Sequence, residues 1–211
     1  RALNNAVRNS TGDLLIFCDQ DLIFGEEYIE TIANNIKSNV FLMGRAHHTT
    51  EEQKNLILSD IENINSYNEI IKKLPAKYIK TIDKMLKEDR KRRIIKTLRL
   101  AKRGIKLVGM SYALMKEAYL KVNGYDENYI GWGQEDDDFG NRFFKYGGET
   151  FVFKMKMYPI HMYHKAAILG ESPNEDYYRQ RKNEISKKNY RCEYGYDKTF
   201  GEDKYKVIEI K

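Results

Sequence analysis

Two aspartates stand one residue apart in an apolar stretch of the sequence, FCDQDLIF at residues 17–24. Leucine, isoleucine and phenylalanine residues surround Asp19 and Asp21, and a carboxylate is costly to bury unless something pairs with it. One interpretation is a divalent cation that the carboxylates hold and that bridges to a phosphate-bearing substrate. The other is a turn whose aspartates cap the next helix, and the D-x-D pattern alone favours this second interpretation.

A second acidic cluster follows a tryptophan in the segment GWGQEDDDF. Four successive carboxylates, Glu135 to Asp138, repel one another, and the N-terminus of a helix would offset part of that cost. This interpretation does not account for Trp132, the only tryptophan of the chain, which lies between two glycines. A flat aromatic side chain followed at once by carboxylates suits stacking on a sugar whose hydroxyls are hydrogen-bonded. The segment therefore predicts a sugar-binding loop.

Two histidines, His161 and His164, lie in the segment HMYHK. A lone histidine is more often a structural residue, but an imidazole beside an acidic metal site is a suitable extra ligand. The spacing brings the two rings together only in a helix, because on a strand they would face opposite ways. We expect one of them to be a ligand, not both.

The elements that must position these residues follow from the hydrophobic pattern. Helices are predicted at residues 1–9 and about 26–37. In the second helix the residues expected to face inward are Tyr28, Ile29, Ile32, Ala33 and Ile36. Continuous apolar runs predict strands at 13–18 and 40–46, of the kind that an α/β sheet covers on both faces, and a further strand is expected near ETFVFKM. The first aspartate pair then falls where a strand ends, the usual place for ligands in an open α/β sheet.

The length of 211 residues, with 41% hydrophobic content, fits a single domain, 1–211, better than two. Residues 50–106 are charged and poor in glycine and aromatics, so we expect a helical insertion rather than a second domain. Residues 172–211 read as a polar, tyrosine-rich tail. Because the sequence begins with Arg1 rather than methionine, we expect it to start inside a longer chain.

The net charge of +6 is unevenly distributed, and residues 87–106 are strongly basic. Apolar residues at helical spacing make this run an amphipathic helix: Ile94, Ile95, Leu98, Ala101 and Ile105. A solvated basic face over a buried apolar stripe is the first interpretation, and peripheral contact with an anionic membrane surface or an anionic acceptor is the second. Nucleic acid comes last, because the run lacks interleaved aromatics, and we expect no such partner.

Cys18 and Cys192 lie far apart in the sequence and lack the spacing of a metal site. They are expected to be reduced residues of a cytoplasmic protein, associated with the inner face of a membrane if the basic run binds there. The sequence contains no apolar run long enough to span a bilayer and no signal-peptide pattern.

Taken together, these segments resemble the family 2 glycosyltransferases. RALNNAVRNSTGDLLIFCDQDLIF is similar to the pattern in which an Arg–Asn helix precedes a strand that ends in D-x-D. NGYDENYIGWGQEDDDFGNRFFKYGG is similar to the acceptor-side motif of beta-galactosyltransferases and bacterial chondroitin polymerases. MYHK stands where those enzymes carry a metal-binding histidine, and the insertion ending in KKLPAKY resembles the chondroitin polymerase type. The agreement covers most of residues 1–164.

The resemblance implies a GT-A fold, an α/β architecture with a mixed sheet flanked by helices. The first strands of that fold, which grip the uracil, would be missing before Arg1. It also implies an inverting transfer from a nucleotide sugar, a UDP-sugar, to a saccharide acceptor in polysaccharide or surface glycan synthesis. The implied cofactor is Mn²⁺ or Mg²⁺.

Carried over residue by residue, the resemblance assigns Asp21 and His164 to the metal and Asp19 to the donor ribose or a metal-bound water. It assigns Asp136 as the catalytic base and Arg1 to a phosphate contact. The positions with which the family binds the acceptor sugar correspond here to Trp132, Gly133, Glu135 and Asp137. His161 stands where the galactosyltransferases have a methionine, so its role stays open.

Two alternatives remain. A metal-dependent phosphohydrolase would use the same carboxylates to activate water and would not need Trp132. A noncatalytic sugar-binding fragment is compatible with the missing nucleotide-binding strands.

Overall fold

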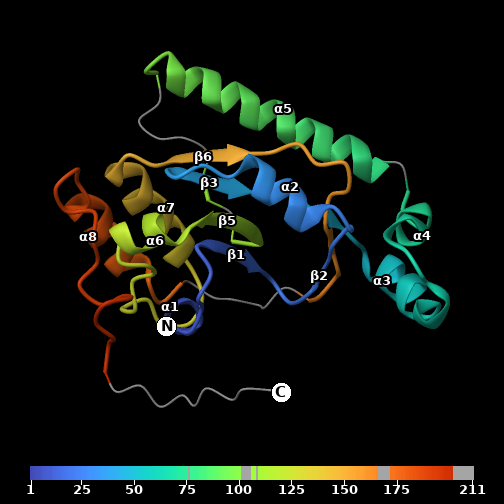
Figure 1. Cartoon of the computed structure of the whole chain (residues 1–211), viewed down its shortest axis with the longest axis horizontal. Coiled ribbons are helices and arrows are strands. Elements are labelled where there is room, and N and C mark those ends of the chain that lie inside the picture. The colour runs from blue at the N-terminus through green and yellow to red at the C-terminus, as the bar shows by residue number, and fades with distance from the viewer. Residues whose placement is uncertain (76, 101–105, 108, 166–171, 202–211) are drawn as a thin grey trace.

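The computed structural model describes the chain except residues 76, 101–105, 108, 166–171 and 202–211. Its strands form two sheets, a four-stranded one in the order β1-β5-β3-β6 and a three-stranded one in the order β2-β7-β4. The strands are β1 (Leu14–Cys18), β2 (Leu22–Ile23), β3 (Val40–Met43), β4 (His47–His48), β5 (Ser111–Met115), β6 (Glu149–Val152) and β7 (Ile160–His161). Both sheets contain antiparallel and parallel pairs. The mixed sheets, flanked by helices, are the α/β architecture that the sequence predicts (Figure 1).

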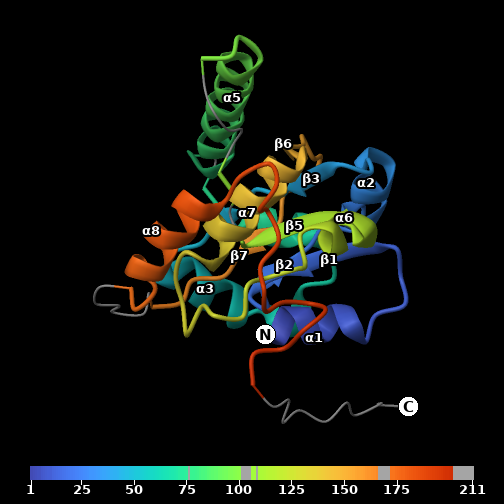
Figure 2. The same ribbon diagram turned by 90° about the vertical axis from the view of Figure 1, so that its left-hand side faces the viewer.

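The helices surround the larger sheet and extend from it (Figures 1 and 2). Residues 50–106 hold the helices α3, α4 and α5 and a short 3₁₀ helix, η1. The helical elements are α1 (Ala2–Arg8), α2 (Tyr28–Asn35), α3 (Glu51–Leu58), η1 (Ile61–Asn63), α4 (Tyr67–Lys72), α5 (Lys77–Thr97), α6 (Lys116–Lys121), α7 (Glu135–Tyr146) and α8 (Glu175–Glu184). Helices α1 and α2 and strands β1, β3 and β6 fall within or overlap the segments for which the hydrophobic pattern predicts them.

Strand β5 lies at the centre of the core, where buried side chains from both faces of the sheet meet. Tyr112 and Leu114 pack with Phe139 and Phe143 of α7, whereas Ala113 packs with α2 on the opposite face. The alternation follows from the strand period of two. Several of the largest fully buried side chains of this core are aromatic. The polar residues described below lie next to this core.

One of two predictions about burial near β1 is wrong. Helix α2 buries Tyr28 and Ile32, but Ile29 is 58% exposed and Ala33 is exposed, because this short helix contacts the sheet along one narrow stripe. Strand β1 was expected to be covered on both faces, and it is: Leu15 and Phe17 pack in one core cluster, and Leu14 and Ile16 pack against the other. It is also an edge strand of the larger sheet, antiparallel to β5, so most of its side chains are only partly buried.

The basic run also differs from its first interpretation. Helix α5 ends at Thr97, and the predicted stripe residues Ala101 and Ile105 lie outside the described residues. Ile94 and Leu98, which were expected to be buried, are 55% and 62% exposed. At this end of α5 the inward-facing side chains are instead cationic and pack on the aromatic rings beside them, as described below.

Among the described helices, none is long and apolar enough to cross a membrane. Both cysteines are free thiols: Cys192 is buried, whereas Cys18, expected in an apolar environment, is exposed at the edge of a cavity.

Candidate active site

The three-stranded sheet brings Asp21 next to both histidines of the HMYHK segment. Leu22 on β2 pairs with His161 on β7, so Asp21, one residue earlier, lies beside the end of β7. The Nε2 atoms of His161 and His164 lie 3.5 Å and 3.3 Å from Asp21 Oδ2. The backbone N–H of Met162 donates a 2.9 Å hydrogen bond to the carbonyl of Asp21, which holds the two segments together. Long-range strand pairing thus assembles this group.

The two histidines come together without a helix. The chain leaves β7 after His161 and is irregular at His164, yet the ring centroids lie 5.4 Å apart. A third imidazole, His48 on β4, lies 4.8 Å from the ring of His161, because the two residues are partners in the parallel β4–β7 pair. Sequence reasoning missed His48, although the adjacent pair His47–His48 was a visible signal. The single-ligand expectation stays a prediction.

The chemistry of this group suits a divalent cation. One ligand atom from each of Asp21, His161 and His164 lies within 4.8 Å of the others, and Asp19 is not part of that group among the described residues. Asp21 Oδ1 is buried and has no hydrogen-bond partner in the part of the chain that the structure describes. Burial and the neighbouring Asp21 charge raise the pKa of Asp19, a repulsion that a cation would relieve. The residues present therefore fit a metal with carboxylate and imidazole ligands.

Asp136 is a carboxylate that two neighbouring cavities share. The first cavity, of about 360 Å³, includes Asp19 in its lining, and the second, of about 440 Å³, includes Lys106. Trp132, Glu135 and Asp136 line both of them. The carboxylate therefore lies between a cavity that Asp19 lines and a cavity that Lys106 and Asp137 line, with Trp132 in the wall of both.

The surroundings of Asp136 change its acidity. Burial, together with the charges of Glu135 and Asp19, raises the pKa of Asp136 to about 6, although a hydrogen bond from Tyr125 acts in the opposite direction. The hydroxyl of Tyr125 donates to Asp136 Oδ1 at 2.8 Å. The other oxygen, Oδ2, is so close to Gly109 that a Cβ added there would overlap it. Glycine at 109 is therefore required for the carboxyl to adopt this position.

The four carboxylates of the EDDD run open helix α7, as the sequence predicts, and they diverge rather than share one site. Successive residues of a helix are about 100° apart around its axis, so each points to different partners. Glu135 Oε2 accepts from the backbone of Gly133 at 2.7 Å, and Asp137 Oδ2 lies 2.7 Å from Lys106 Nζ. Asp138 is fully buried and pairs with Arg142 at 2.6 Å.

The loop that carries Trp132 has an unusual backbone. Gly131, Gly133 and Gln134 all have positive φ, at 69°, 116° and 66°. Two of these positions are glycine, for which the left-handed region carries no steric cost. Trp132 between them is 65% exposed, so its indole is available to a ligand at the mouth of both cavities.

Hydrogen bonds from the start of α8 and the segment before it hold this loop in place. The sequence analysis did not predict these contacts. The side chain of Asn174 donates to the carbonyls of Ile130 at 3.1 Å and Gly133 at 2.9 Å, and it accepts from the Ile130 N–H at 3.0 Å. The side chain of Gln134 also forms two hydrogen bonds: it donates to Glu175 and accepts from Ser172, both at 2.6 Å. The backbone of the tryptophan loop is thus held at both ends by side chains remote in sequence.

Arg1 contacts a buried carboxylate. Its Nε lies 3.3 Å from Glu127 Oε2, and Asn4 and Arg8 also bond the Glu127 side chain. The phosphate contact expected of Arg1 stays a prediction.

Comparisons with known proteins agree with this arrangement. A family model described as glycosyl transferase family 2 matches residues 1–104, which include Asp19 and Asp21. A model described as the N-terminal domain of galactosyltransferase matches residues 90–165, which include Asp136 and His164. Together with the mixed sheets and flanking helices, the two matches support a glycosyltransferase domain of the GT-A, family 2 type in this chain.

Among individual proteins, beta-1,4-galactosyltransferase 4 of Mus musculus is similar to this chain over a short stretch. The two are 58% identical over 33 residues, which are 16% of this chain and 10% of the mouse enzyme. The matched stretch is therefore a small part of that relative's length.

Proposed function

We propose that this chain is the catalytic part of an inverting glycosyltransferase, with residues 1–211 acting as one domain. It would move a hexosyl group from a UDP-sugar to a saccharide acceptor in glycan synthesis. The observation that carries the proposal is the position of Asp136, in the wall of both the cavity that Asp19 lines and the cavity that Asp137 lines, with Trp132 beside both. A base that serves a transfer between two substrates must reach both of them.

In this proposal the donor diphosphate lies on the side of Asp19 and Asp21. Asp21 and His164 would hold a divalent cation, with His161 beside them, and the cation supplies positive charge next to the leaving diphosphate. Family 2 glycosyltransferases commonly use such a cation, and Mn²⁺ is our choice because imidazole suits it better than it suits Mg²⁺. Arg1 is assigned to a further phosphate contact.

The acceptor sugar lies on the other side, with its ring on Trp132 and its hydroxyls near Glu135 and Asp137. Gly133 lets the loop backbone approach the sugar closely. Asp136 takes the proton of the attacking hydroxyl as its oxygen bonds to the anomeric carbon from the face opposite the diphosphate. A pKa of about 6 suits this role, because the carboxylate is ionised at neutral pH and is more basic than an ordinary aspartate.

The test is UDP release from a panel of UDP-sugars, measured with and without saccharide acceptors. We expect release only when both substrates are present, and loss of it in Asp136→Asn. A matched control is Asp176→Asn, which changes an exposed carboxylate on α8 and should leave the rate unchanged. Release that needs no acceptor would support a phosphohydrolase, and saccharide binding without release would support a sugar-binding fragment.

A further inference from the structure

One face of helix α5 is exposed and combines basic with apolar side chains, and two of its residues, Arg90 and Ile94, also line a cavity beside β6. Lys87, Arg90, Lys91, Ile94 and Leu98 are all exposed, and their spacing puts them in a single stripe along the helix. We call these five residues the α5 outer face. Leu100, just beyond the helix, is 77% exposed and extends its apolar end.

Contacts on the opposite side of α5 fix this orientation. Asp89 is buried and accepts hydrogen bonds from Arg45 at 2.7 Å and 3.1 Å. Farther along, the guanidinium of Arg93 lies 4.9 Å from the ring centroid of Phe151, and Lys96 Nζ lies 3.0 Å from Glu149. With basic residues occupying the inward side, Ile94 and Leu98 have no core to enter.

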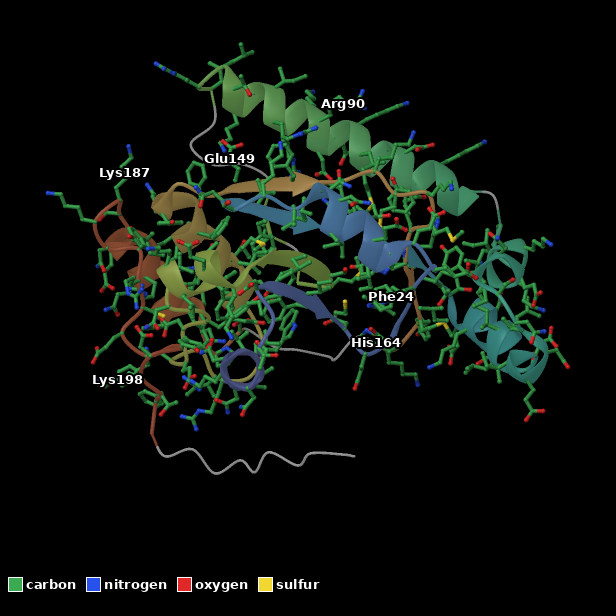
Figure 3. All side chains as sticks on the ribbon, in the orientation of Figure 1. Phe24, Arg90, Glu149, His164, Lys187 and Lys198 are labelled. Atoms are coloured by element: carbon green, nitrogen blue, oxygen red, sulfur yellow. The ribbon has the colours of Figure 1, made fainter. Side chains whose placement is uncertain are left out.

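The helix also stands at the margin of the molecule. It runs along β6, the edge strand opposite β1, and Figure 2 shows it projecting from the layers of the sheet. Arg90 and His164, labelled in Figure 3, lie on opposite sides of the sheet. A surface could therefore contact the α5 outer face without covering the candidate active site.

The composition of the face points to its partner. Asp83, exposed one turn before Lys87, lies in the same stripe, but between residues 87 and 98 the three cations have no carboxylate in it: Asp89 is buried, and Glu88 is about 100° around the helix from Ile94 and Leu98. We infer that the α5 outer face binds the surface of an anionic phospholipid membrane. Lys87, Arg90 and Lys91 would contact the headgroup phosphates while Ile94, Leu98 and Leu100 enter the acyl boundary.

Two other partners fit the face less well. A nucleic acid would leave the exposed apolar residues unexplained, because its backbone offers them no apolar contact. A second copy of the chain, packed face to face, would bring like charges together, and lysine is depleted at the centre of protein interfaces.

The test is co-sedimentation of the full-length chain with vesicles of phosphatidylcholine alone or of phosphatidylcholine mixed with phosphatidylglycerol. We expect binding to the mixed vesicles only, with release as salt rises. Changing Lys87, Arg90 and Lys91 together to glutamine should weaken partitioning by about 100-fold, at about fivefold for each charge. Changing Lys182, Lys187 and Lys188 to glutamine removes the same charge from α8 and the segment after it, and should have little effect.

Three further measurements separate a membrane from its rivals. Ile94→Ser with Leu98→Ser should weaken partitioning on the order of tenfold, because apolar burial is lost. Soluble glycerol phosphate in excess should not displace the chain. Sedimentation velocity without lipid should give the same species for wild type and the serine variant, and the rate of transfer to soluble acceptors should not change in any of these variants.

The proposal is overturned if neutral vesicles bind equally well, or if the α8 control loses as much binding as the α5 variant. Unchanged binding of the serine variant would reduce the contact to simple charge attraction and contradict the insertion of Ile94 and Leu98 that the proposal requires. Displacement by glycerol phosphate would identify a free phosphate site. A wild-type dimer that the serine variant dissociates would make the face a protein interface.

Discussion

The hydroxyl of Tyr125 donates a 2.8 Å hydrogen bond to Asp136 Oδ1, and the hydroxyl of Tyr112 lies 2.6 Å from that of Tyr125. Because the Tyr125 proton is directed to the carboxylate, Tyr112 must donate to Tyr125. The ring of Tyr125 is stacked on Phe139 at 4.6 Å between centroids. A buried row of rings therefore sets the position of the carboxyl that we propose as the base.

Asp136→Asn keeps the shape of the side chain and removes the base. We expect turnover to fall by roughly 10²–10⁴-fold, while donor and metal binding survive. Steady-state UDP release together with calorimetric titration of donor measures both quantities. Near-normal turnover, or a loss explained by failure to bind donor, would contradict the assignment.

The same variant should be more stable than wild type at neutral pH. The pKa of Asp136 is raised from its ordinary value of 3.8 to about 6, so the folded protein holds the proton more tightly than the unfolded chain. The ionised carboxyl therefore costs folding stability as pH rises from about 4, and the cost is complete above about 6. Thermal unfolding without metal should show a gain in Tm for Asp136→Asn at pH 8 that disappears near pH 4. A gain that does not vary with pH would mean another cause.

The pH profile of transfer should report the same ionisation. The rate should fall as pH drops through about 6, because Asp136 must be ionised to accept a proton. Tyr125→Phe removes a hydrogen bond that stabilises the ionised carboxylate, so the acid limb should move to higher pH. An acid limb at the same pH in wild type and Tyr125→Phe would show that another group is titrating.

A further prediction concerns metal dependence. Activity should vanish with a chelator and return more readily with Mn²⁺ than with Mg²⁺. His164→Ala should weaken Mn²⁺ binding far more than His161→Ala, although both rings lie within 3.5 Å of Asp21. Isothermal titration of Mn²⁺ into each variant distinguishes them. Equal losses would make both histidines ligands, and full activity in chelator would remove the metal from the mechanism.

Asp138 should be structural, unlike its neighbour at 136. It pairs with Arg142 at 2.6 Å, and neither side chain is exposed. Removing one partner of a buried ion pair leaves an uncompensated charge, which costs about 3–5 kcal/mol of folding free energy. Asp138→Asn should lower urea stability by this order and leave turnover per folded molecule near wild type. A stable but inactive variant would contradict this division.

Asn174 should act mainly on the binding of the acceptor sugar. Asn174→Ala removes its bonds to the backbone of Ile130 and Gly133 and frees the loop that carries Trp132. We expect the acceptor KM to rise about tenfold, with a smaller change in donor KM, because an interface built on a mobile loop must first order it. Asn174→Asp keeps the side-chain oxygen that accepts a hydrogen bond from the Ile130 N–H, and it should recover only that bond. A uniform loss of kcat with unchanged KM would contradict a positioning role.

Much of the local structure could be predicted from the sequence, because its causes are local. The apolar run before the first aspartate indicates a strand, and the acidic run after Trp132 indicates the start of a helix, where the dipole offsets the crowded charge. The resemblance of three motifs in order then indicates the family, which the comparisons confirm.

Contacts between distant segments could not be predicted in the same way. Asp21 meets His161 because β2 pairs with β7, and Tyr125 reaches Asp136 because a loop packs over the first turn of α7. The spacing of apolar residues indicates which face of a helix or strand is apolar. It does not indicate which other part of the chain will pack on that face. The stripe of Ile94 and Leu98 shows this limit: the sequence alone determined that α5 is amphipathic, and only the tertiary structure decided which side is covered. It did so because Arg45, Phe151 and Glu149 accommodate the charged side of the helix, which leaves the apolar residues in solvent.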